Sequence, residues 1–306
     1  MKNSDLTFTI DTADGDYTIV RPGLSICLIY ADTADVIGPD VAKILEEYIK
    51  FIPDGALQTY LADSGIWKKA TQRTFNSVFS NLLDVGEGNY SEFHFGQEPA
   101  GNVGDYGAHF KAGPLDDDFF DREANILHLE FPMEFAEPPA AERLADFFAR
   151  LVSIRAPDSG YCGYAFKHLF MTFTNEALEF IARRAMRYTG FDVPEDAIRI
   201  WARGRVYNVS WLTVLGPDIL AELGGKDQVR QQRTSELAVF DVGEALVIRA
   251  ADLPIVGDVN RGATDVEGLK KLAEITKPVR IELEMLGPGE LDLATRWPNR
   301  FDRPGH

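Results

Sequence analysis

The spacing of apolar residues changes repeatedly along this chain, and these changes restrict its fold more than any other feature. Some runs alternate apolar and polar residues, as strands do, and others repeat apolar residues every three or four positions, as helices do. Helical spacing occurs in 38–52, 67–84, 140–154, 175–190, 217–225 and 265–276. Strand patterns occur in 6–10, 16–31, 90–97, 105–113, 124–135, 207–216, 236–243, 244–250 and 278–286, and 160–173 is predicted to be a pair of strands.

The order of these segments predicts an α+β protein with antiparallel or mixed sheets and flanking helices. From residue 207 the order matches a ferredoxin-like βαββαβ unit, and the first half is roughly similar. The sequence "DVIGPDVAKIL" at 35–45 is echoed by "LTVLGPDILAEL" at 212–223, through either a pseudo-duplication or a recurring helix start. We predict an N-terminal half, 1–190, and a C-terminal half, 191–306, with one compact domain as the alternative.

The chain is strongly acidic, with 48 Asp and Glu against 31 Lys and Arg and a formal net charge of −17. Such a surface repels nucleic acid and anionic lipid, and it speeds the encounter with basic proteins. The simpler alternative is that the charge only keeps the protein soluble. We therefore expect no nucleic-acid partner and no membrane partner.

The N-terminus and the cysteines predict where the protein is located and whether it contains a disulfide. The N-terminus carries acids early and lacks a continuous apolar stretch, and no window reaches about 18 apolar residues. We expect a cytoplasmic protein without a membrane span. Cys27 and Cys162 lie in separate apolar runs, which predicts two buried free thiols rather than a disulfide or a metal site.

Two Gly-Pro-Asp turns precede predicted helices, and the second raises the question of a phosphate-binding loop. Gly216-Pro217-Asp218 lacks the second glycine and the lysine of a P-loop, and no Gly-x-Ser-x-Gly nucleophile elbow is near it. Proline suits the first turn of a helix, and a glycine pair suits its end. We therefore predict that this turn and Gly224-Gly225 only begin and end a helix, and that Pro39 lies in the first turn of segment 38–52.

Three histidines fall in three successive predicted strands. His94, His109 and His128 would converge on one face if those strands are neighbours, which is one way to build a three-histidine zinc site. The alternative is that each is a cross-strand polar residue on the solvated face of an antiparallel sheet. Local spacing such as His-x-His is missing, so we predict no metal and no cofactor.

The most unusual local feature is the acidic stretch "GPLDDDFFDRE" at 113–123. It lacks the glycine and the closing glutamate of a calcium loop. It is either a solvated loop with inward phenylalanines or an anionic patch with aromatic anchors for a basic groove on a protein partner. The partner-binding candidates are Asp116, Asp117, Asp118, Phe119, Phe120, Asp121 and Glu123.

The C-terminal third resembles a bacterial family of type VI secretion immunity proteins, first catalogued as a domain of unknown function. The resemblance is carried, in order, by Tyr207, Trp211, Leu215, Gly216, Leu223, Gly224, Gly225, Pro254, Gly257, Asp258, Gly262, Pro278 and Arg280. It implies a protein that binds and neutralises a toxin delivered between bacteria. It assigns no inhibitory residue.

The resemblance and the composition lead to one leading hypothesis and two alternatives. The leading hypothesis is a non-enzymatic immunity protein that occludes a cytoplasm-acting toxin, with a nuclease favoured because nucleic-acid clefts are basic. No Ser-His-Asp or similar catalytic set can be assembled from the sequence. The alternatives are a small-ligand sensor, with a pocket between two ferredoxin-like halves, and an enzyme using carboxylates or the histidines. Homo-oligomerisation is left open.

Overall fold

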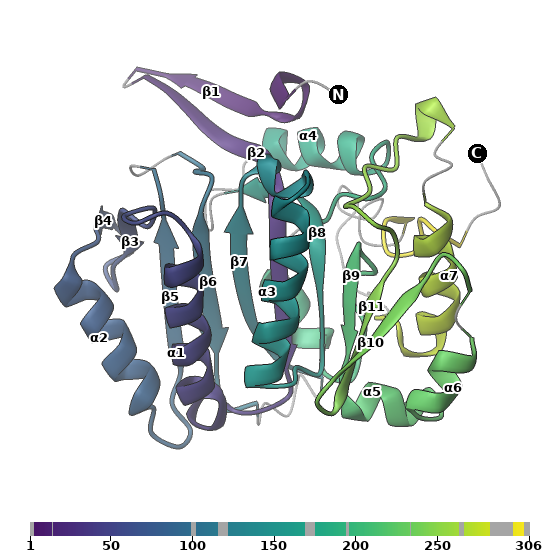
Figure 1. Ribbon diagram of the computed structural model, residues 1–306. Helices are drawn as coiled ribbons and strands as arrows, with labels where there is room; N and C mark the ends of the chain where they lie inside the picture. Colours follow the sequence, from purple (N-terminus) through teal and green to yellow (C-terminus); the bar gives the residue numbers. More distant parts are fainter. Residues whose placement is uncertain are drawn as a thin grey trace.

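The strands form one antiparallel sheet that runs through both predicted halves of the chain (Figure 1). The computed structural model describes residues 3–13, 15–98, 102–115, 122–168, 175–193, 196–232, 234–262, 266–281 and 296–302. Within these residues eleven strands pair in the order β10-β11-β9-β8-β2-β7-β6-β5-β3-β4, and β1 pairs with β2. Their bounds are β1 Phe8–Thr12, β2 Gly15–Tyr30, β3 Thr59–Leu61, β4 Trp67–Lys69, β5 Ser91–Gly96, β6 Gly107–Ala112, β7 Asn125–Phe131, β8 Ser159–His168, β9 Leu212–Leu215, β10 Ala238–Val242 and β11 Ala245–Arg249.

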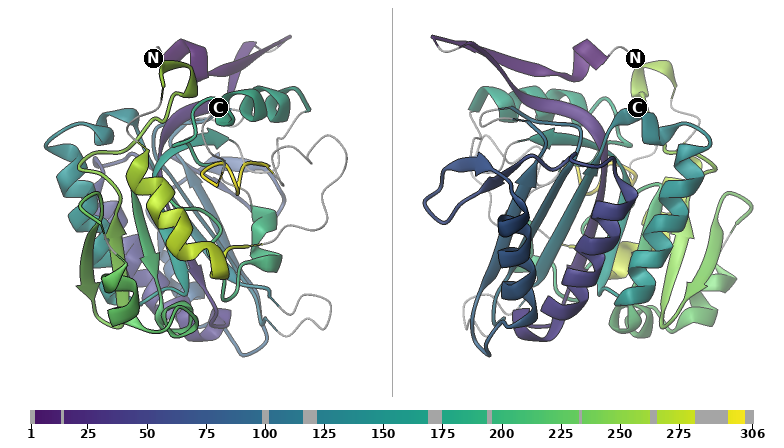
Figure 2. Two further views of the ribbon diagram at one scale, coloured as in Figure 1. Left: turned by 90° about the vertical axis from the view of Figure 1, so that its right-hand side faces the viewer. Right: turned by 60° about the vertical axis from the view of Figure 1, so that its left-hand side comes forward.

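Helices cover both faces of the sheet. Their bounds are α1 Ala34–Phe51, α2 Gln72–Leu83, α3 Ala140–Ile154, α4 Asn175–Ala185, α5 Pro217–Glu222, α6 Lys226–Gln231 and α7 Glu267–Thr276. Helices α1, α2 and α3 lie side by side on one face (Figure 1), and α7 packs on the other face beside β9 and β11 (Figure 2). Short 3-10 turns occupy Asn3–Leu6, Met133–Ala136, Asp196–Trp201, Val259–Arg261 and Lys277–Val279.

The core under α1 and α3 is built from aromatic rings. Phe51 of α1 stacks on Phe147 of α3 with ring centroids 4.1 Å apart, and both meet Phe131 of β7 edge-on. Tyr48 also packs edge-on against Phe131, and its hydroxyl donates to the Glu130 carbonyl. Burial of such rings contributes a large part of the folding free energy, because each removes a large apolar area from water.

The sequence analysis predicted the α+β class and most elements correctly. The helix at 140–154 has the predicted bounds, and both cysteines are buried thiols that are not joined in a disulfide. Gly216 is the N-cap of α5 with Pro217 following it, and Gly224 and Gly225 both adopt positive φ at the end of that helix. These glycines therefore begin and end a helix, as predicted.

Several element predictions were wrong. Pro39 lies inside α1, which begins five residues earlier at Ala34. The two Gly-Pro-Asp sequences therefore have different positions: the first lies inside α1, and the second begins α5. The predicted helix at 67–84 begins only at Gln72, because Trp67–Lys69 pairs with β3 as strand β4. The predicted pair of strands at 160–173 is a single strand as far as His168, beyond which 169–174 lie outside the described residues.

The sheet does not consist of two ferredoxin-like units. In a ferredoxin-like unit the third strand lies between the first two, and the fourth strand lies on the other side of the first. Strands β9, β10 and β11 match the first three, but the strand on the other side of β9 is β8. The described start of the predicted strand 278–286 is a 3-10 turn, Lys277–Val279. In the first half, β2 lies between β7 and β8. The division into 1–190 and 191–306 remains a prediction, and the β8–β9 pairing joins the two parts.

None of the helices in the described residues has the length and apolar character needed to cross a bilayer.

Candidate functional site

The structure describes only one of the predicted partner-binding residues. Asp116, Asp117, Asp118, Phe119, Phe120 and Asp121 lie outside the described residues. Glu123 is buried, 7% exposed, and its carboxylate is 2.6 Å from the guanidinium of Arg199. The Glu123 side chain is therefore engaged inside the protein, where it holds the Asp196–Trp201 turn against the start of β7.

The three histidines form a row across β5, β6 and β7. The register pairs His94 with His109 and His109 with His128, so all three side chains leave the same face of the sheet. The Nδ1 atoms of His94 and His109 are 3.0 Å apart, and the Nε2 of His128 is 3.9 Å from the Sγ of Cys27 on β2. His94 is 3% exposed and His128 is 5% exposed, so the predicted solvated face is wrong for these two residues.

Carboxylates hold the two outer ends of the His94–His109 pair. His94 Nε2 donates to Glu92 at 2.6 Å, and His109 Nε2 lies 3.7 Å from Glu130. Burial lowers the pKa of His94, so the ring is neutral, and with Nε2–H donating to Glu92 its Nδ1 accepts a hydrogen bond from the Nδ1–H of His109. The hydrogen bond from His94 in turn holds the pKa of the Glu92 carboxyl below its ordinary value.

Burial also governs the charge states of the neighbouring groups. It lowers the pKa of His128 to about 3, with the positive charge of His109 adding to the effect. Burial disfavours the charged form of Glu130, but the neighbouring His109 and the charge of Lys167 outweigh it and lower the pKa of that carboxyl. These contacts make the row a cross-strand hydrogen-bonding network inside the protein.

The row does not support the three-histidine zinc alternative. Nowhere in the residues that the structure describes do three His, Cys, Asp or Glu side chains come together as a set able to hold a metal ion. The ring nitrogens of His94 are instead both used by His109 and Glu92.

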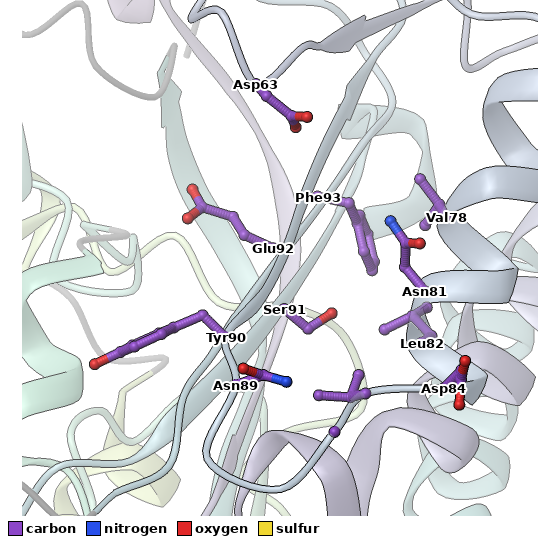
Figure 3. A pocket seen from close by; sticks show the side chains of 12 residues that line it. Asp63, Val78, Asn81, Leu82, Asp84, Asn89, Tyr90, Ser91, Glu92 and Phe93 are labelled. Atoms are coloured by element: carbon purple, nitrogen blue, oxygen red, sulfur yellow. The ribbon is translucent and has the colours of Figure 1, made fainter.

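A groove lies between α2 and the adjoining part of β5. It consists of two hollows of about 570 Å³ and about 460 Å³, which share lining residues and therefore adjoin. The shared residues are Asp63, Val78, Asn81, Glu92 and Phe93. Figure 3 shows the smaller hollow, lined from the β3–β4 turn, α2 and β5. We call this surface the α2–β5 groove.

The family is decided by a match across most of the chain. Residues 40–301 match the family model TsiV, described as type VI immunity for VRR-NUC. The chain belongs to this family. Membership supports a role as an immunity protein directed against a VRR-NUC nuclease toxin, and the sequence resemblance to type VI immunity proteins is thereby confirmed.

A solved structure shares the TsiV fold seen here. The Pseudomonas aeruginosa T6SS protein PA0821 superposes with a TM-score of 0.77 at 19% identity, covering 97% of this chain and 87% of that one. At this identity the likeness concerns the fold alone. No curated protein sequence matches the chain significantly.

Residues that carried the resemblance are structural in this TsiV chain. Trp211 is 2% exposed and its indole donates to the Ala251 carbonyl, and Arg280 donates to the Ala273 carbonyl. Gly257 adopts φ of 63°. These residues hold the fold together, which explains why they identify the family without identifying the binding surface.

Proposed function

We propose that this protein binds the VRR-NUC nuclease of a type VI toxin in the cytoplasm and blocks its nucleic-acid cleft with an acidic surface. The observation that carries the proposal is the TsiV match over residues 40–301. The net charge of −17 supports the mechanism, because a nuclease cleft that binds phosphates is basic and attracts an acidic inhibitor. The inhibitor acts by occupying the cleft, and no catalytic step is required of it.

The test is a titration of the purified VRR-NUC nuclease with this protein, read out as cleavage of a labelled DNA. A stoichiometric inhibitor abolishes cleavage at one equivalent, whereas an enzyme that inactivates the toxin would do so at far lower ratios. An unrelated nuclease of similar charge is the control and should keep its activity. Full cleavage at excess inhibitor would overturn the proposal.

The charge mechanism has its own test. Association of the two proteins should slow as salt rises, because ions screen the attraction between exposed charges. An association rate that does not depend on salt would contradict the acidic mechanism while leaving inhibition itself intact.

The acidic stretch remains a proposed part of the binding surface. Asp116, Asp117, Asp118 and Asp121 would supply anionic charge, and Phe119 and Phe120 would anchor the contact. Replacing the four aspartates by serine should weaken toxin binding, and unchanged affinity would remove this stretch from the proposal. Glu123 is kept out of this variant because it is paired with Arg199.

A further inference from the structure

The α2–β5 groove contains part of a sheet edge that none of the described strands covers. Strand β3 pairs with β5 only at Gly96 and Phe95, and Ser91–Phe93 lie beyond that pairing. Alternate residues of a strand direct their N–H and C=O groups to opposite sides. At least one residue of Ser91–Phe93 therefore directs its backbone toward the groove, where an added strand could pair with it.

One large apolar side chain stands exposed in the lining of the same groove. Tyr90, just before β5, lines the smaller hollow and is 70% exposed. It is the most exposed of the large apolar side chains in the described part of the chain. An exposed tyrosine at a hollow is a side chain of the kind that anchors protein interfaces.

The end of the groove near the α2 C-terminus is negative. Asp63, Asp84 and Glu92 line it, and all three are exposed. Among the described residues, neither Asp63 nor Asp84 forms an ion pair. The carbonyl end of α2 adds partial negative charge, and its last turn contains no basic residue. The larger hollow shares Asp63 and Glu92 but is also lined by Lys68, Lys69 and Arg73, so only the hollow that contains Asp84 is lined by acids without a lysine or arginine.

We propose that the α2–β5 groove binds an extended segment of the VRR-NUC toxin, with a lysine or arginine at its acidic end. The segment adds to the edge of β5 through backbone hydrogen bonds, and one of its apolar side chains covers Tyr90. This inference rests on the proposed function, and it goes further by assigning the surface and the chemistry of the toxin segment.

The test measures the affinity of this protein for a catalytically inactive VRR-NUC domain. One variant combines Asp63→Asn with Asp84→Asn, and the second variant is Tyr90→Ser. We expect each variant to raise the Kd roughly tenfold, because exposed interface charges and apolar anchors each contribute modestly. The matched control is Glu244→Gln with Asp252→Asn, two exposed acids beside β11, which should change the Kd less than about twofold.

Hydrogen–deuterium exchange supplies the second measurement. Backbone amides of β5 and of the β3–β4 turn should exchange more slowly in the complex than in the free protein. If the complex forms but both variants bind normally and these amides show no protection, the groove assignment is wrong and the proposed function stands. If the unmodified protein fails to bind at all, the proposed function itself fails. Thermal unfolding of each variant verifies that it is folded.

Discussion

We predict that His128 makes the protein sensitive to acid. Its side chain is buried beside His109, and burial lowers its pKa from 6.5 to about 3. In the unfolded chain the ring regains its ordinary pKa. Between pH 6.5 and 3 the unfolded chain therefore binds a proton that the folded protein does not, so this contribution to stability is present above pH 6.5 and is lost as the pH falls.

The size of the effect follows from the two pKa values. Lowering the pH from about 8 to about 5 protonates His128 almost fully in the unfolded chain and hardly at all in the folded protein, which costs about 2 kcal/mol of stability. The substitution His128→Leu removes the titrating ring and keeps an apolar side chain of similar size. The variant should lose about 2 kcal/mol less stability than the unmodified protein over the same interval.

Urea unfolding at both pH values measures this difference. Each protein is compared with itself at the two pH values, so any direct effect of the substitution on stability cancels. The reasoning is refuted if His128→Leu loses as much stability as the unmodified protein between the two pH values. That result would mean that the proton is taken up elsewhere.

Three further substitutions test buried contacts in other parts of the protein. Gly190→Ala should destabilise the protein by about 3 kcal/mol, because the new Cβ would overlap the Ile255 carbonyl oxygen, and a lowered Tm measures this. Lys167→Met should cost about 1–3 kcal/mol in urea unfolding, because the buried ammonium donates to two backbone carbonyls that would lose their donor. Glu123→Gln should cost about 3 kcal/mol by breaking the buried pair with Arg199, while the Kd for the toxin stays unchanged; a raised Kd in a folded variant would instead place Glu123 at the interface.

The sequence predicted a helix or strand correctly where its local apolar pattern was strong. The helix at 140–154 has a strong apolar face, and Leu144, Phe147 and Leu151 are all fully buried. The histidine row was anticipated as a set of neighbours, because each ring occupies an equivalent position in three successive strands. Alternation fixes which face a side chain leaves, but it does not say whether that face is covered. The burial of His94 and His128 could therefore not be read from the pattern.

The start of α2 was missed because its capping signal is unusual. Thr71 and Thr74 form a reciprocal capping box, in which each side chain accepts from the other residue's backbone N–H. The usual capping-box sequence has Glu or Gln three residues after the N-cap, so the sequence Thr-x-x-Thr did not indicate a helix start. Strands β3 and β4 have three residues each, too few for alternation to distinguish them from a loop.

The groove could not be predicted because it depends on tertiary pairing. Tyr90 lies in the connection between α2 and β5, directly before an ordinary short strand. The edge beside it is uncovered because β3 pairs only with the end of β5. No local pattern contains that information, since strand length and partner choice are set by distant residues.

The two ends of the sheet differ in a way that favours the groove as the binding surface. At the β10 edge, Asp241 is held by Lys226 and Arg230 of α6, at 3.2 Å and 2.5 Å. These contacts neutralise the acid within the protein and place charged side chains along the edge, which discourages the addition of another strand. At the β5 end, Asp63 and Asp84 lack such an ion pair among the described residues, and Tyr90 stays exposed. An acidic protein that meets a basic partner gains most where its negative charge is not already compensated, so the β5 end is where the toxin should bind.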